Sequence, residues 1–405
     1  MMTNTQNATI CDVAVIGAGP AGLMAAISAA RGGARVRVFE KLPAAGRKLL
    51  ASGGGHCNAA NTASAASFMA AFGRQGRFME PVLRELPLDR LVQFFDSIGV
   101  RLVADGDGRY MPETQSAKDV LDALLLEANA AGVTVSCGDS VRRLDIRDGR
   151  VAGIFHSTDT HTAARAVILA TGGRGYPDLG GGTSGYDLAR QAGHSIREPL
   201  PALTGVQTHE GWPGTLAGIV VDPAEVRLEG RARFAVRSGA LLFTHHGVSG
   251  PAVIDLAGDV AELIEKGRAA TLRISLLPGR VAADILEEWA RLRLTDGSRR
   301  LRSWLKDLFP VALADRLLMC ADIPADTMFA YLTAPGAKAL AGLLTETMLH
   351  VRETDGFDRA MVTRGGIVLR DVEPRSLESR LVGGLFFCGE ALDLDGPCGG
   401  YNLQW

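Results

Sequence analysis

The chain has 405 residues, 47% of them hydrophobic, and a formal net charge of −2. This length supports two or three domains, and the charge lacks the basic excess of nucleic-acid-binding or membrane-surface proteins. No apolar run approaches the roughly 20 residues of a membrane-spanning helix, and the first residues lack the basic n-region and cleavage site typical of a signal peptide. Six cysteines lack CxxC or zinc spacing, as is typical of a reducing compartment. We therefore expect a soluble cytoplasmic protein without a metal, with a small-molecule substrate and with neither nucleic acid nor membrane as partner; its oligomeric state stays open.

The first predicted elements form a strand–helix–strand unit. The apolar run at 11–16 leads into Gly17-Ala18-Gly19-Pro20-Ala21-Gly22, then a helix over 23–31 and a strand over 35–39. In this G-x-G-x-x-G pattern the glycines permit a tight turn, close approach to a pyrophosphate and packing of the helix on the strand. Glu40 ends the second strand, where a carboxylate can accept hydrogen bonds from ribose hydroxyls and disfavours a 2′-phosphate. The unit predicts a dinucleotide site, for FAD or NAD rather than NADP.

The elements that follow predict a doubly wound α/β domain interrupted by an insert. A helix is expected over 118–131, and strands near 133–137, 150–155 and 166–170. After about residue 195, proline-marked alternating segments such as 231–236 and 240–243 indicate β structure, and 282–350 has helical Leu and Ala spacing. Strand signals return at 366–369 and 384–388. We expect a Rossmann-type domain in 1–195 and 351–405, with an insert domain, β-rich and then helical, in 196–350.

A second glycine cluster near the end of the chain favours FAD over NAD. Gly389-Glu390 follows a predicted strand, so its carboxylate could meet ribityl hydroxyls. Gly399-Gly400 could open a helix whose N-terminus stabilises the negative charge of reduced flavin. Between the two clusters, a basic pair leads into a glycine loop at 47–58 that could run along a long cofactor, although a solvated surface loop would have the same composition.

Several motifs closely resemble the bacterial YhiN/BaiN-like flavoproteins, also described as aminoacetone-oxidase-like FAD-binding enzymes. They are GAGPAGLMAA, GRKLLASGGGHCNAAN, ILATGG with Tyr176-Pro177, LFTHHGVSGPAV and GLFFCGEALDLDGPCGGYNLQ. The resemblance covers nearly the whole chain. It implies an FAD-binding Rossmann-type domain with an inserted β-rich plus helical region.

The resemblance also implies which residues bind FAD. The ADP half would contact Gly17, Ala18, Gly19, Pro20, Ala21, Gly22, Glu40 and Lys41, with Val141 near adenine; the pyrophosphate and flavin would contact Arg47, Lys48, Ser52, Gly53, Cys57, Asn58, Ala170, Thr171 and Gly172; and the ribityl and isoalloxazine end would contact Gly389, Glu390, Asp395, Gly396, Gly400, Tyr401 and Asn402.

The chain departs from the family pattern in two places. His56 stands where the family usually has arginine, which replaces a fixed charge with a titratable one. An acidic side chain usual after Tyr-Pro is missing from Gly180–Gly185. The family also continues with a further helix beyond the position of Trp405, which we expect to complete the first domain.

Candidate catalytic residues are His245, Tyr176 and Cys57. His245 could act as a base or substrate anchor, or cap an ordinary loop. Tyr176 is a pocket residue by position, and Cys57 could form a redox pair with Cys398 or pack as a small apolar group. Ser249 in GVSG is not a nucleophile elbow, because Pro251 stands where that motif needs glycine.

These observations predict an FAD-dependent oxidoreductase that acts on a small organic substrate by hydride transfer through the flavin. It could resemble an amine oxidase or an NAD(P)H-dependent reductase. The sequence has no second G-x-G-x-x-G unit, so NADH or NADPH would bind only transiently. The alternatives are a non-catalytic flavin-binding redox sensor or assembly protein, and an NAD-dependent dehydrogenase without flavin.

Overall fold

The computed structural model describes residues 9–157, 159–230 and 236–405, and it divides into two compact units. The first comprises Met1–Leu200 and Met361–Trp405, and the second comprises Pro201–Ala360. The predicted insert boundaries, 196 and 350, fall within strands β10 (Ile196–Ala202) and β16 (Thr347–Thr354).

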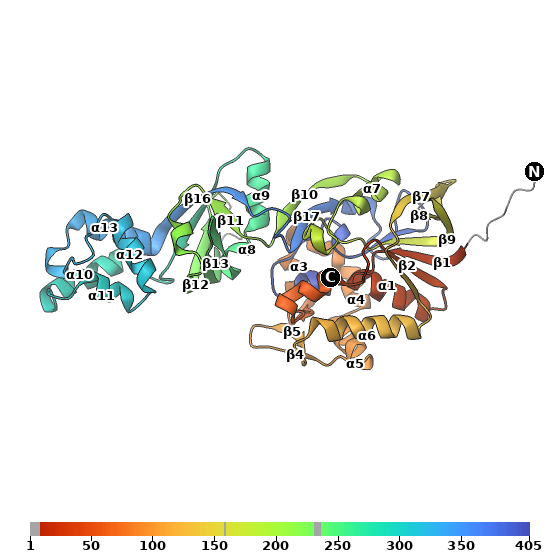
Figure 1. The fold of residues 1–405 in the computed structure, drawn as a ribbon, viewed down its shortest axis with the longest axis horizontal. Helices are drawn as coiled ribbons and strands as arrows, with labels where there is room; N and C mark the ends of the chain where they lie inside the picture. The colour runs from red at the N-terminus through yellow and green to blue at the C-terminus, as the bar shows by residue number, and fades with distance from the viewer. Residues whose placement is uncertain (1–8, 158, 231–235) are drawn as a thin grey trace, which may run out of the picture. The chain divides into compact units, whose positions relative to one another are not determined.

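The first unit contains a seven-stranded sheet in the order β6-β2-β1-β9-β8-β7, with β18 also paired to β9. Figure 1 labels β1, β2, β7, β8 and β9 of this sheet. Its strands are β1 (Thr9–Ile16), β2 (Val36–Glu40), β6 (Thr134–Cys137), β7 (Val141–Arg147), β8 (Arg150–His156), β9 (Thr160–Leu169) and β18 (Leu385–Phe387). The β6, β2, β1, β9 and β18 strands are parallel, as apolar runs joined by helices require. This arrangement confirms the predicted Rossmann-type fold.

Both faces of this sheet are covered. On one face, Val15 and Val38 belong to a hydrophobic core that also contains buried residues of α1 (Pro20–Arg31), α5 (Leu88–Ser97) and α6 (Ala117–Ala130). The alternate residues Ala14, Ile16 and Phe39 belong to the core on the other face, with α7 (Ser184–Gln191). Smaller elements of the unit are α2 (Arg47–Ala51), α3 (Ala65–Ala71), α4 (Glu80–Glu85), α14 (Tyr401–Gln404), the sheet β3-β5-β4 (Ala60–Asn61, Arg109–Pro112, Leu102–Ala104) and the pair of β10 with β17 (Val362–Ile367).

The second unit is a closed six-stranded barrel followed by helices. The barrel order is β11-β14-β13-β12-β15-β16, formed by Val206–Thr208, Gly247–Ser249, Val236–Phe243, Val220–Leu228, Ala270–Ser275 and Thr347–Thr354. Its helices are α8 (Pro251–Ile254), α9 (Ala257–Glu265), α10 (Ala282–Thr295), α11 (Leu301–Lys306), α12 (Val311–Cys320) and α13 (Ala334–Glu346). One continuous apolar core runs through the barrel and helices.

Several element predictions need correction. The segment 282–350 is not helical to its end, because residues from Thr347 onward form β16, which pairs with β15 and closes the barrel. The strand expected at 366–369 instead spans Val362–Ile367. The strand expected at 231–236 lies, apart from Val236, outside the described residues.

Candidate cofactor-binding site

Four parallel strands end at one edge of the first unit's sheet. Ile16 of β1 pairs with Phe39 of β2 and with Leu169 of β9, and Leu169 pairs with Phe387 of β18. The segments after these strands, Gly17–Gly22, Glu40, Ala170–Gly172 and Gly389–Glu390, therefore meet at the carboxyl edge, where doubly wound sheets bind ligands. Strand register thus brings together glycine clusters from both ends of the sequence.

In the first glycine loop, Gly17 and Gly22 are tightly packed and Gly19 faces free space. Gly17 has φ +106°, and a β-carbon there would overlap the carbonyl oxygen of Ala170. A β-carbon at Gly22 would overlap the carbonyl oxygen of Gly17, so the helix packs on the turn only without a side chain. A β-carbon at Gly19 would meet no described atom within 4 Å. The loop therefore leaves free space at the N-terminus of α1, where helix amides favour phosphate.

Glu40 braces this loop from the end of β2. Its Oε2 accepts a hydrogen bond from the Ala18 N–H at 2.8 Å, and its Oε1 accepts one from the Leu42 N–H at 2.9 Å. Each carboxylate oxygen keeps a second lone pair that a ribose hydroxyl could use. The side chain is only 9% exposed, so it is fixed before any ligand binds.

An ion pair joins the two halves of the predicted cofactor site. Lys48 Nζ lies 2.8 Å from Glu390 Oε2, and both side chains are less than one-third exposed. Glu390 Oε1 accepts a hydrogen bond from the Thr363 N–H at 2.9 Å. Gly173 must lack a side chain here, because a β-carbon would overlap both Thr363 Oγ1 and the Glu390 carboxylate. The ion pair fixes α2 relative to the end of β18.

The C-terminal cluster is held against β3. A β-carbon at Gly400 would overlap the Ala60 carbonyl oxygen and lie 2.7 Å from Asn58 Oδ1. Asn58 Oδ1 is buried and has no hydrogen-bond partner in the described part of the chain. Asn402 Oδ1 accepts from the Gly396 N–H, its Nδ2 donates back to the Gly396 carbonyl, and the Tyr401 ring stacks on Phe68 at 5.2 Å.

The other predicted cofactor residues occupy varied positions. Gly389 has φ +68° and adjoins Ala21, where its β-carbon would lie 2.8 Å from the Ala21 methyl. Pro20 is the first residue of α1 and Gly172 has φ +69°. The remaining positions are Lys41, exposed after β2; Arg47, exposed in α2; Ser52, whose hydroxyl donates to the Leu49 carbonyl; Gly53, with φ +58°; Thr171, packed on Gly185; and Val141, buried at the start of β7.

The structure gives no support to Cys57 as a catalytic or redox thiol. Its side chain is fully buried, and this burial raises its pKa to about 11. A thiol that stays protonated and inaccessible is not a nucleophile. Cys57 packs with Leu49 and Ala59 in the core, so the small apolar alternative describes it better.

The other catalytic candidates are differently placed. Tyr176 has φ +54°, a left-handed conformation that is rare for a bulky residue and common at functional loops. His245 is exposed in the turn between β13 and β14 of the second unit. His56 is exposed in the glycine loop of the first unit, and its Nδ1 lies 2.9 Å from the Gln115 carbonyl oxygen.

Two important residues carried no sequence signal. Thr363 is fully buried, and its hydroxyl accepts hydrogen bonds from the Arg174 and Gly175 N–H groups at 2.7 and 3.2 Å. Arg364 forms an ion pair with Asp395 at 2.9 Å, with both side chains largely buried. A lone Thr-Arg pair before Gly365 belongs to no known motif, so only the three-dimensional pairing of β17 with the C-terminal segment reveals them.

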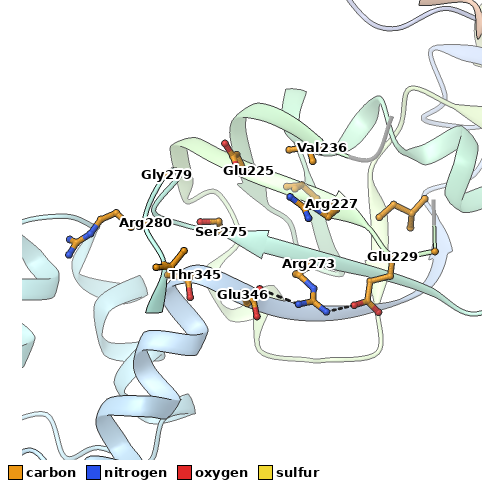
Figure 2. A pocket seen from close by; sticks show the side chains of 14 residues that line it. Glu225, Arg227, Glu229, Val236, Arg273, Ser275, Gly279, Arg280, Thr345 and Glu346 are labelled. Carbon is orange, nitrogen blue, oxygen red and sulfur yellow. Dashed lines mark hydrogen bonds and ion pairs between the residues drawn. The ribbon is translucent and has the colours of Figure 1, made fainter. Parts of the chain in front are cut away.

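A cavity also lies elsewhere, on the barrel of the second unit. It has a volume of about 900 Å³ and is lined by β12, β15, the loop at 279–281 and the end of α13. Figure 2 shows Arg273 between Glu229 and Glu346, with which it forms ion pairs of 2.6 and 3.2 Å. Gly230 and Val236 of its lining flank residues 231–235, which are not described, so no ligand is assigned to this cavity.

Within the described ranges, no helix combines the length and apolar character needed to cross a bilayer. The same ranges contain no group of three or more His, Cys, Asp or Glu side chains placed to hold a metal ion.

The residues at the sheet edge fit FAD. Free space over Gly19 beside a helix N-terminus suits a pyrophosphate, and the Glu40 carboxylate suits a ribose. Further polar groups of the first unit could extend this site. They are the Asn58 oxygen, which has no partner in the described part of the chain, and the Lys48–Glu390 ion pair. A site with these additional groups suits a ligand longer than a mononucleotide. The fold and this site define a Rossmann-type dinucleotide-binding protein.

Comparison with known proteins identifies the family. Residues 11–405 match the family described as HI0933-like protein Rossmann domain, so the chain belongs to this flavoprotein family. It is 32% identical to a 3-dehydro-bile acid delta(4,6)-reductase of Clostridium scindens, across 97% of this chain and 95% of that protein. It is 29% identical to a ribosomal RNA dihydrouridine synthase of Escherichia coli, across 97% and 94%.

A solved structure supports the fold. A 3-ketosteroid delta1-dehydrogenase from Sterolibacterium denitrificans superposes with a TM-score of 0.53, at 13% identity and over 98% of this chain and 97% of that one. The family and the bile acid reductase relative together indicate an FAD-dependent oxidoreductase.

Proposed function

We propose that this protein reduces a carbon–carbon double bond conjugated to a carbonyl group in a small organic substrate, with FAD as its cofactor. Two relatives that match nearly the whole chain support this choice, because the names of both describe that chemistry. A 3-oxo bile acid with double bonds at positions 4 and 6 is a conjugated enone, and dihydrouridine is uridine with its C5=C6 bond reduced. Bound FAD, once reduced, would supply a hydride to the carbon β to such a carbonyl, and a proton from solvent would complete the reduction at the α carbon.

The chain's own residues hold the cofactor rather than perform bond chemistry. The Gly17–Gly22 loop with the α1 N-terminus binds the pyrophosphate, Glu40 the ribose, and the Lys48–Glu390 pair fixes the loops that follow α2 and β18. The reaction adds two hydrogens to substrate, so an electron donor is oxidised in turn. NADH or NADPH fills this role in the proposal, bound only transiently.

Charge favours a small substrate over RNA. Proteins that bind nucleic acids neutralise several phosphates with Lys and Arg, but this chain has 43 basic and 45 acidic residues. The observation that carries the proposal is the match to the bile acid reductase over nearly the whole of both chains.

The test is anaerobic reduction of substrates by the FAD-loaded protein with NADH or NADPH. We expect loss of the enone absorption of a 3-oxo-Δ4 steroid such as 4-androstene-3,17-dione. Uridine-containing RNA and simple amines are tested alongside. If the protein forms dihydrouridine in RNA but does not reduce the steroid, its substrate is RNA and not a small molecule. If only amines bleach the flavin, the amine-oxidase alternative is favoured.

A further inference from the structure

The His156 side chain joins two parts of the first unit through both of its ring nitrogens. Its Nδ1 lies 2.8 Å from Asp139 Oδ1, in the loop between β6 and β7, and its Nε2 lies 2.9 Å from Thr162 Oγ1 of β9. A carboxylate only accepts hydrogen bonds, so the bond to Asp139 places a proton on Nδ1. His156 is 5% exposed and the Asp139 side chain 17%, so water competes little for these bonds.

This Asp–His–Thr arrangement has the distances of a catalytic triad but not its accessibility. The hydroxyl of a triad attacks the substrate and must therefore be reached by it. Thr162 is fully buried, and its strand is paired on both sides, with Thr9 of β1 and with Ile154 of β8. The three side chains therefore hold one another in place, and their effect depends on the segments that they connect.

His156 and Asp139 contact the residues around Glu40, the carboxylate that suits the ribose of FAD. The His156 ring lies 4.8 Å from the ring of Phe39, the residue before Glu40, measured between ring centres. The Asp139 N–H donates to the Glu40 carbonyl oxygen at 2.8 Å, and the preceding N–H of the loop donates to the Leu42 carbonyl oxygen at 2.8 Å. Glu40 is therefore fixed by the loop after β6 as well as by its own strand.

The loop that makes these contacts, residues 138–140, is itself attached to the end of β8. The Ser157 N–H donates to the Ser140 carbonyl oxygen at 2.9 Å, and the Ser157 hydroxyl donates to Asp139 Oδ1. A continuous set of hydrogen bonds thus runs from β9 through His156 and Asp139 to Glu40.

Binding of a ribose requires that the Glu40 carboxylate keep one orientation. Its two oxygens already accept hydrogen bonds from the Ala18 and Leu42 N–H groups, so only the remaining lone pairs are left for a ligand. Hydrogen bonds weaken steeply when donor and acceptor are misaligned, and a binding group has to be held within roughly 0.5 Å of its productive position. A shift of the Glu40 backbone therefore costs affinity even when the carboxylate itself is retained.

We propose that His156 is a positioning residue for the ribose of FAD, because it holds Glu40 in its ribose-binding orientation through Asp139 and Phe39. This inference rests on FAD as the cofactor of the proposed function and deepens that site, and it is independent of which substrate is reduced. No contact with the cofactor is assigned to His156. Its replacement should weaken binding of the ribose while every direct contact residue is retained.

The test is equilibrium binding of ADP and of 2′,3′-dideoxy-ADP to the protein freed of FAD, by isothermal titration calorimetry. The two nucleotides differ only in the ribose hydroxyls that Glu40 would bind. In wild type, ADP should bind about 10- to 100-fold more tightly, as hydrogen bonds to a charged group contribute. His156→Gln keeps an amide near the position of Nε2 but loses the bond to Asp139. It should weaken ADP binding about 3- to 10-fold and leave dideoxy-ADP binding unchanged.

Two variants serve as matched comparisons. His156→Asn carries its amide nitrogen near the position of Nδ1, so it can still donate to Asp139 and should bind ADP within about twofold of wild type. His161→Asn breaks a second histidine–aspartate bond of the first unit, in which His161 Nε2 lies 3.0 Å from Asp145 Oδ2. His161 also has a ring contact of 4.8 Å, but with Phe155. This variant should lower stability in urea unfolding and still bind both nucleotides like wild type.

The pair of nucleotides separates positioning from a purely structural role. If His156→Gln weakens both nucleotides alike, it acts on the fold as a whole, and if it weakens neither, Glu40 does not depend on it; either result overturns the proposal. If wild type does not distinguish ADP from dideoxy-ADP, Glu40 does not bind the ribose and the proposal fails with that assignment. Neither steroid nor reductant is present in this assay, so a failure of the proposed reduction leaves these affinities unchanged.

Discussion

Gly19→Ala separates cofactor binding from folding at the first glycine loop. Gly19 caps α1 with φ −77° and ψ 178°, an extended conformation that alanine adopts freely. Its β-carbon would meet no described atom within 4 Å, so the protein has room for it. Alanine is a poorer N-cap than glycine, which destabilises the folded state, but it also restricts the unfolded chain, which stabilises the protein. Because these effects oppose each other, we expect the free energy of unfolding to stay within about 1 kcal/mol of wild type.

The added methyl group instead occupies the space assigned to the pyrophosphate. Overpacking by a methyl or methylene costs about 1–3 kcal/mol, which corresponds to about a 5- to 150-fold weaker Kd. The assay is titration of apoprotein with FAD, followed by quenching of flavin fluorescence, with urea unfolding measured in parallel.

Gly342→Ala is the matched control, because it adds the same methyl group in open space within α13 of the second unit. It should stabilise that helix by about 0.5–1 kcal/mol and leave FAD affinity unchanged. If Gly19→Ala binds FAD as tightly as wild type, the pyrophosphate does not pass over Gly19 and the assignment of the loop is wrong.

Three further predictions concern the first unit. In a double-mutant cycle of Lys48→Met and Glu390→Gln, we expect the free energies of unfolding in urea to show a coupling energy of about 1–3 kcal/mol, because the ion pair is largely shielded from water. If the two single effects simply add up in the double variant, the pair makes no such contribution. Burial lowers the pKa of His194, so its contribution to stability is complete above pH 6.5 and is lost as pH falls through the lower folded-state pKa. The advantage of wild type over His194→Gln in thermal unfolding should therefore shrink between pH 7 and pH 5, and an unchanged gap would refute this. Cys57→Ala should retain steroid reduction within about twofold, since the buried thiol is not a nucleophile; a loss of about 100-fold with full FAD content would restore a catalytic role.

Local patterns predicted the first strand–helix–strand unit well because its signals are short-range. The apolar run before Gly17, the proline at the start of α1 and the acidic end of β2 each lie within about 30 residues, the length of one βαβ unit. The same patterns could not show that β16 closes a barrel, because Thr347–Thr354 alternates in burial only through its pairing with β15 and β11. Leu and Ala spacing in α13 therefore led to a helical expectation that ran too far.

The site was predicted less evenly than the fold. Glycines that permit close packing, such as Gly17, Gly22 and Gly400, were found because their residue type itself is the signal. Burial was not visible in the sequence, so the patterns left Cys57 open between a reactive thiol and a small apolar core residue, and the structure places it in the core. Thr363 was missed because its role depends on the loop after β9, nearly 200 residues earlier in the chain.

The pairing of β18 with β9 determines when during synthesis this protein can bind its cofactor. Leu169 and Phe387 are register partners, and the whole second unit is translated between them. At about 5–20 residues per second, roughly 10–40 s separate the appearance of these two strands. During this interval β9 lacks its partner strand β18, and Lys48 lacks its ion-pair partner Glu390. We therefore expect FAD to bind only after translation of the second unit is complete.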